Sequence, residues 1–237
     1  MVPNFFRLAP EAPAISEKLW LFAETAYLDN PLPSLFKERL FVVLSRFAAS
    51  SYCVARHLGF LVGLGRASGD AQARPLRVRE VIRLLQHTLP YGHELELRLS
   101  LCTDCPSPIA ELPVADSQIE HAIFALAGHV FLQTDVAPVC LDALQRLLGG
   151  IRFQHLILFL TYVRADHYWT KIHPELELDS DIKVFLASHP ELAACILLDG
   201  RRNSSGTSQE GCCEFRMRND DVSHGNCMTV PARAWLP

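Results

Sequence analysis

The 237-residue chain lacks a long apolar run, a basic cluster and a strand-like alternation of apolar and polar residues. No apolar run reaches the ~18 residues that a membrane span needs, so we expect no membrane span. Lys and Arg are scattered and the net charge is −4, which argues against nucleic acid as a partner. The N-terminus shows no apolar segment behind a basic start, so no signal peptide is expected. These absences together favour a cytoplasmic protein.

What the chain has is the composition of a globular protein with a sizeable core. The hydrophobic fraction is 49% and the mean hydropathy is +0.14, well above the range of disordered chains. Apolar residues recur every three or four positions in most of the sequence, and this spacing predicts an all-α fold. The expected helices lie at 13–27, 35–47, 52–64, 76–87, 119–133, 139–148, 181–188 and 190–198, with a shorter one near 95–102 and one or two within 152–176.

The helical pattern stops abruptly near Leu198. We therefore predict one helical domain at residues 1–198 and a tail at 199–237. The tail has no periodicity and is rich in Gly, Ser, Asn and Arg, so it is expected to be disordered. Its contrast with the well-patterned domain suggests a foreign or out-of-frame end.

The stretch from Leu35 to Gly65 carries the side chains best suited to acid–base or thiol chemistry. Cys53 and His57 are four apart and share one face of a helix. Cys53 lies in the first turn, where the helix dipole favours a thiolate. Glu38 lies in the preceding helix, about three turns from the connection at Ser50. By that count, a third helix or a partner subunit would have to bring Glu38 to His57, where the pair could relay a proton.

The same stretch resembles a known family. AhpD-like proteins, the alkylhydroperoxidase D and carboxymuconolactone decarboxylase superfamily, share a sequence signature. It consists of a Glu, then eleven residues, then Cys-x-x-Cys, then three residues and a His. Here Glu38, Cys53 and His57 match, and Ser50 replaces the first cysteine. Longer runs between residues 2 and 198 resemble the AhpD-like module at the N-terminus of bacterial PAS-containing hybrid sensor histidine kinases. The resemblance implies an all-helical fold, a homo-oligomer joined through helical faces, and PAS and kinase regions that this chain lacks, as if truncated.

The serine at position 50 decides which function the resemblance implies. The redox disulfide of AhpD-like enzymes needs both cysteines of the motif, so Ser50 prevents it. We predict a sensory or ligand-binding module that is not an enzyme. Residues proposed to line its pocket are Ser50, Tyr52, His167, Trp169 and His173.

Two alternatives stay open. One is a thiol-dependent peroxidase that uses Cys53, with His57 and Glu38 as the proton relay. The other is that Cys53 is a small buried hydrophobe and His57 a core histidine. No residue argues for a decarboxylase.

The sequence predicts neither a metal nor a cofactor. Cys102 and Cys105 form a lone CxxC without a partner motif at zinc-finger spacing, and their position before Pro106 predicts a solvent-facing loop. His167 and His173 are six apart and do not share a helix face.

A weak internal repeat is also visible. A shift of 117 residues places His155 on Glu38, His167 on Ser50, Trp169 on Tyr52 and Thr170 on Cys53, which suggests two degenerate helical hairpins.

Overall fold

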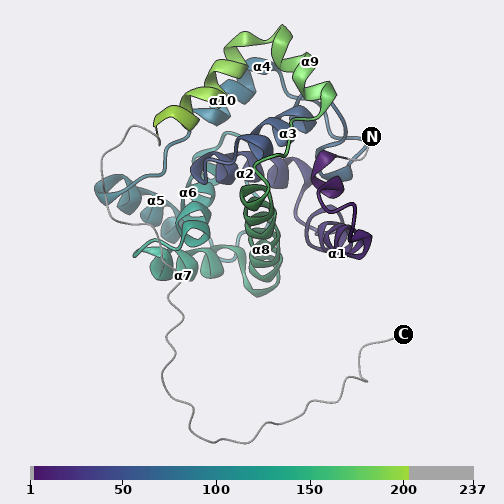
Figure 1. The fold of residues 1–237 in the computed structure, drawn as a ribbon. Coiled ribbons are helices and arrows are strands. Elements are labelled where there is room, and N and C mark those ends of the chain that lie inside the picture. Colours follow the sequence, from purple (N-terminus) through teal and green to yellow (C-terminus); the bar gives the residue numbers. More distant parts are fainter. Residues whose placement is uncertain (1–2, 203–237) are drawn as a thin grey trace, which may run out of the picture. The chain divides into compact units, whose positions relative to one another are not determined.

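The computed structural model describes the backbone of residues 3–202 and the side chains of residues 3–196. Within that part of the chain all regular structure is helical, which confirms the all-α prediction (Figure 1). The first five helices are α1 (Pro13–Ala23), α2 (Ser34–Phe47), α3 (Ser51–Leu61), α4 (Val78–Leu85) and α5 (Gly92–Asp104). The others are α6 (Gln118–Leu132), α7 (Ala137–Leu148), α8 (Gly150–Ile172), α9 (Ser180–Ser188) and α10 (Pro190–Arg202).

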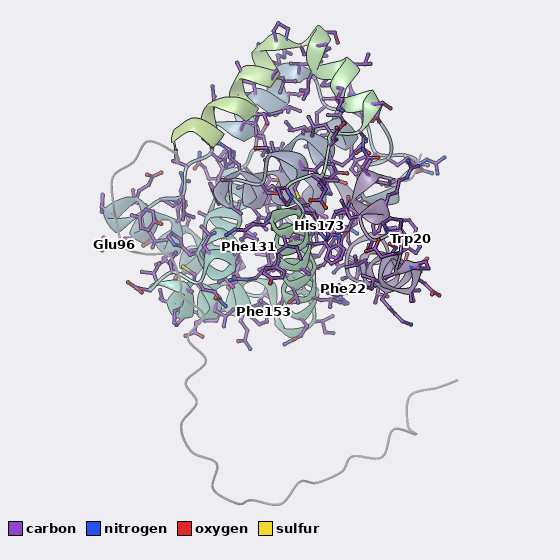
Figure 2. All side chains as sticks on the ribbon, in the orientation of Figure 1. Trp20, Phe22, Glu96, Phe131, Phe153 and His173 are labelled. Atoms are coloured by element: carbon purple, nitrogen blue, oxygen red, sulfur yellow. The ribbon has the colours of Figure 1, made fainter. Side chains whose placement is uncertain are left out.

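Helix α2 is the central element. Every side chain from Phe36 to Ser45 is buried, as the wide apolar arc of this segment predicts. The helix packs against α3, α4, α6 and α8 (Figure 1), and side chains fill the space between these helices (Figure 2). The chain leaves α2 at Ala48 and starts α3 at Ser51, which confirms the predicted turn at Ser50.

The end of α1 is wider than a regular helix. The predicted helix 13–27 is helical throughout, but its last turn, Glu24–Leu28, is a π-helix. Lys37 stabilises this turn, because its buried ammonium donates hydrogen bonds to the carbonyls of Tyr27 at 2.5 Å and Asn30 at 2.7 Å. Such π turns often accompany functional sites, and this one directs Tyr27 toward α2.

The second half begins with a capped helix and contains one long helix. Ser117 caps α6, since its Oγ accepts from the Glu120 amide at 3.2 Å. The Glu120 carboxylate accepts from the Asp116 amide at 2.7 Å and from Arg39. Helix α8 is continuous from Gly150 to Ile172, so the turn that the internal repeat requires near His167 is absent from this helix.

Helix α10 continues to Arg202, past the predicted domain end at residue 198. The rest of the predicted tail lies outside the described residues. Among residues 3–202, no helix has both the length and the apolar character that a bilayer crossing requires.

Candidate functional site

A cavity of about 550 Å³ lies beside the α2–α3 hairpin. Its walls are largely apolar and come from the N-terminal segment, α1, the π turn, α3, the loop after α3, α8 and the start of α9. The aromatic lining residues are Phe5, Phe6, Trp20, Tyr27, Tyr52, Phe60 and Tyr162. The polar and charged side chains on this surface are Cys53, Arg56, His57, Arg66, Asp166 and Asp181. An apolar cavity with a few convergent polar groups is the usual form of a small-molecule site.

His57 and Glu38 are in direct contact. The Nδ1 atom of His57 lies 2.8 Å from the Oε2 atom of Glu38, and both side chains are buried. The expectation that a third helix or a partner subunit must bring them together was therefore wrong. Phe41 lies one turn after Glu38 on the same face of α2 and stacks on the imidazole, with ring centroids 3.5 Å apart. This stacking draws His57 onto the face that carries Glu38.

Glu38 has two further hydrogen-bond donors. The Tyr27 hydroxyl donates to its Oε1 atom, and the backbone amide of Ser68 donates to the same oxygen at 2.7 Å. Burial, together with the neighbouring Glu38 carboxylate, raises the pKa of Tyr27 well above its usual value. Because Glu38 binds Nδ1 of His57, the Nε2 atom is the nitrogen available to a molecule in the cavity.

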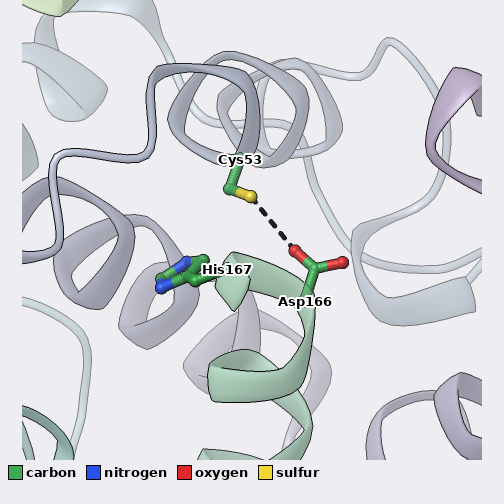
Figure 3. Close-up of side chains that lie close together, drawn as sticks. All are labelled: Cys53, Asp166 and His167. Atoms are coloured by element: carbon green, nitrogen blue, oxygen red, sulfur yellow. Dashed lines mark hydrogen bonds between the residues drawn. The ribbon is translucent and has the colours of Figure 1, made fainter. Parts of the chain in front are cut away.

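Cys53 is a protonated thiol in this environment. It is only 1% exposed, and its Sγ donates a hydrogen bond to Oδ2 of Asp166 at 3.1 Å (Figure 3). Burial and the adjacent carboxylate raise the pKa of the thiol well above its usual value. Burial and the charge of Asp166 thus act against the thiolate that the first turn of α3 was expected to favour.

Asp166 is the main functional residue that the sequence did not reveal. It comes from α8, and burial raises its pKa to about 6, although His57 and the Cys53 hydrogen bond act in the opposite direction. The available signal was one acidic side chain three residues after the apolar run Phe153–Val163. That signal is weak, since it does not show which helix the carboxylate faces.

The predicted pocket residues fall into two groups. Ser50, Tyr52 and His167 line a second cavity of about 610 Å³, and Tyr52 lines the first cavity as well. Ser50 Oγ lies 3.3 Å from Oγ1 of Thr170, which in turn lies 3.8 Å from the Cys53 sulfur. Ser50 is thus on the side of Cys53 that faces the second cavity.

Trp169 and His173 form the other group. Neither is among the residues that line the two cavities. The Trp169 ring packs on His173 with centroids 4.5 Å apart, and His173 pairs with Glu175 at 2.7 Å at the end of α8 (Figure 2). Within residues 3–196, these two side chains are separate from the site around Cys53.

The CxxC pair also differs from its prediction. Cys102 lies inside α5 and is buried, and Cys105 is half-buried. The prediction that the pair lies in a solvent-facing loop was therefore wrong. Burial, with smaller effects from Cys105 and Cys140, raises the pKa of Cys102 to about 12. A thiol of this kind is unreactive near neutral pH.

No family model, no curated protein and no solved structure matches this chain. The AhpD-like resemblance, the homo-oligomer and the roles of the site residues therefore stay predictions. What the structure adds is geometry: Cys53, His57 and Asp166 line the same cavity, Asp166 accepts from Cys53, and the buried Glu38 holds His57.

We expect Asp166→Asn to activate the Cys53 thiol. Removing the carboxylate charge lowers the pKa of Cys53, and we expect alkylation by iodoacetamide at pH 7 to be faster by about three- to tenfold. The rate is measured by mass spectrometry of the peptide that contains Cys53. Asp142→Asn on α7, an exposed position, is the matched control and should leave the rate unchanged. An Asp166→Asn rate equal to that of the wild type would contradict this account of the thiol.

Proposed function

We propose that this chain is a sensory, ligand-binding AhpD-like module of a bacterial signal-transduction protein, and that its ligand occupies the 550 Å³ cavity. The observation that carries the proposal is the aromatic cavity with the Glu38-bound His57 in its wall. Its aromatic walls suit a small, largely apolar molecule. The free nitrogen of His57 would select a ligand with one hydrogen-bonding group at that wall.

The state of Cys53 supports binding over catalysis. A thiol nucleophile has to reach the thiolate form, and here burial and Asp166 oppose this. Ser50 removes the second thiol of the family motif. Both features leave the cavity and the Glu38–His57 pair intact while they disfavour thiol chemistry.

A neutral fluorescent probe tests the binding proposal. N-phenyl-1-naphthylamine should bind the full chain with enhanced fluorescence. Ala23 is buried in α1 and lines the cavity, so Ala23→Leu should fill part of it and weaken probe binding by at least about tenfold, which corresponds to about 1.4 kcal/mol.

Ala48→Leu is the matched control, because Ala48 lines the second cavity only. This variant should change the dissociation constant by less than about twofold, within the scatter of surface substitutions. Equal weakening by both substitutions, or no effect of Ala23→Leu, would show that the probe does not occupy the proposed cavity.

A thiol-dependent peroxidase is the second candidate, favoured by the presence of Cys53 and His57 in one cavity. In that reaction the Cys53 thiolate attacks a peroxide oxygen, the O–O bond breaks, and a sulfenic acid and an alcohol form. One external thiol then condenses with the sulfenic acid, which releases water and forms a mixed disulfide with Cys53. A second thiol attacks this disulfide, so that the Cys53 thiol is regenerated and the two external thiols leave as their own disulfide. His57, held by Glu38, would accept the thiol proton and return it to the leaving alkoxide.

Peroxide consumption with a dithiol donor separates the two candidates. We expect a rate no higher than that of the same concentration of free thiol, both for the wild type and for Cys53→Ser. Turnover well above that rate, abolished by Cys53→Ser, would establish the peroxidase and refute a purely sensory role.

A further inference from the structure

Three metal-binding side chains of different types meet between α3 and α8. The Cys53 sulfur, a carboxylate oxygen of Asp166 and a ring nitrogen of His167 all lie within 4.8 Å of one another. Figure 3 shows the Cys53 and Asp166 side chains pointing toward each other, with His167 beside them. All three residues are buried, with exposed fractions of 1%, 6% and 8%. Two of these residues are adjacent on one helix, and the third comes from the helix opposite.

One ring nitrogen of His167 has a hydrogen-bond partner and the other has none within the described residues. Its Nε2 atom lies 2.8 Å from the hydroxyl of Ser45, while its Nδ1 atom is buried and makes no hydrogen bond within the described residues. A buried polar atom without a partner is rare and costs free energy. A hydrogen bond at one ring nitrogen with the other free is the arrangement that metal-bound histidines commonly show.

The donor set suits zinc. Thiolate, imidazole and carboxylate are the three zinc ligands in proteins, at about 2.0–2.3 Å from the ion, whereas Mg²⁺ and Ca²⁺ take oxygen ligands. The Cys53 sulfur and the Asp166 oxygen, 3.1 Å apart, are already close enough to bind one ion together. A thiolate and a carboxylate would balance the charge of Zn²⁺ beside a neutral imidazole.

We propose that Cys53, Asp166 and His167 form a Zn²⁺ site whose fourth position faces a cavity. Cys53 and Asp166 line the first cavity and His167 the second, so water or another ligand can reach the ion. Binding replaces the S–H bond of Cys53 with a Zn–S bond and releases the proton to solvent. The proposal does not depend on the apolar ligand, because it uses different atoms from the aromatic walls.

A second group of donors does not qualify. Asp116, Glu120 and His121 also lie within 4.8 Å of one another. Arg39, however, donates to Asp116 at 2.5 Å and to Glu120 at 2.8 Å. A cation already neutralises both carboxylates, so a metal ion would have to displace a buried guanidinium.

Cobalt substitution tests the zinc site directly. The full chain is stripped of metal with a chelator and titrated with Co²⁺. We expect one equivalent to produce a thiolate-to-cobalt charge-transfer band and the visible bands of a tetrahedral ion, and Zn²⁺ to abolish both. Cys53→Ser should eliminate the charge-transfer band. Cys140→Ser, which removes another buried thiol on α7, should retain it.

Cys53→Ser retains every other cysteine, including Cys212, Cys213 and Cys227 outside the described residues. Loss of the band in this variant therefore assigns the cobalt-bound thiolate to Cys53. A charge-transfer band that persists in Cys53→Ser would overturn the proposal, as would the absence of any band in the wild type. Probe binding in the aromatic cavity is measured separately, so failure of one proposal does not decide the other.

Thermal unfolding gives an independent readout. Zn²⁺ binds the folded site and should raise the midpoint of unfolding for the wild type and for Cys140→Ser. His167→Gln and Asp166→Asn should weaken Zn²⁺ binding by at least about tenfold and lose most of that shift. Circular dichroism first establishes that each variant is folded. An unchanged shift in both ligand variants would refute the assignment.

Discussion

Replacing Arg39 with methionine is expected to lower the free energy of unfolding by about 3–5 kcal/mol. Arg39 lies on α2 and is 1% exposed. Its guanidinium forms a two-pronged contact with Glu120, with Nε to Oε1 at 3.1 Å and Nη2 to Oε2 at 2.8 Å. Methionine fills similar space but leaves the buried Glu120 carboxylate without its cation. The loss is large because a buried charge without a partner is more costly than the pair itself is stabilising.

Urea unfolding measures this effect, with Arg98→Met as the matched control. Arg98 is on α5 and pairs with Glu94 at 3.7 Å at the surface, so its loss should cost less than about 1 kcal/mol. The double variant Arg39→Met, Glu120→Met should be more stable than Arg39→Met alone, because it removes the orphaned charge together with its partner. A loss below 1 kcal/mol for Arg39→Met would contradict this reading of the pair.

Glu38→Ala should destabilise the protein by a similar amount, about 3–5 kcal/mol. The side chain is fully buried and accepts hydrogen bonds from Tyr27, His57 and the Ser68 amide. Alanine leaves three buried polar groups without an acceptor. Glu38→Gln keeps the shape and one acceptor oxygen, so we expect a smaller loss of about half that size.

The same unfolding experiment measures this effect, and Glu96→Ala on α5 is its control. Glu96 is exposed, with a side-chain exposed fraction of 75% (Figure 2), and its removal should change the free energy by less than about 0.5 kcal/mol. Equal stabilities for Glu38→Ala and Glu96→Ala would show that the buried network contributes nothing to folding.

These two residues belong to a run of three buried charges. Lys37, Glu38 and Arg39 follow one another on α2, and each is at most 1% exposed. Because successive helical residues point about 100° apart, they reach different partners: the carbonyls of the π turn, His57, and Glu120. The central helix thus connects the π turn, the cavity-lining His57 and α6 through polar contacts as well as apolar packing.

The helical elements were predictable because they depend on local spacing. The segments for α2, α3 and α6 agree with the structure to within about three residues at each end, since apolar periodicity, proline and capping residues act over a few positions. The sequence left open whether residues 152–176 form one helix or two, and the internal repeat suggested a turn that α8 lacks. An alignment of two apolar helices contains no information about where a helix bends, and α8 has no proline or glycine in its interior.

For the site, the sequence by itself determined that Cys53 and His57 share a face of α3, because residues four apart on a helix are neighbours. Only the tertiary structure decided that Glu38 contacts His57 directly and that Asp166 and His167 reach Cys53 from α8. Asp166 is 113 residues from Cys53 in the chain, beyond any local rule. The protonation of the thiol follows from burial and from that distant carboxylate, and both exist only once the helices have packed.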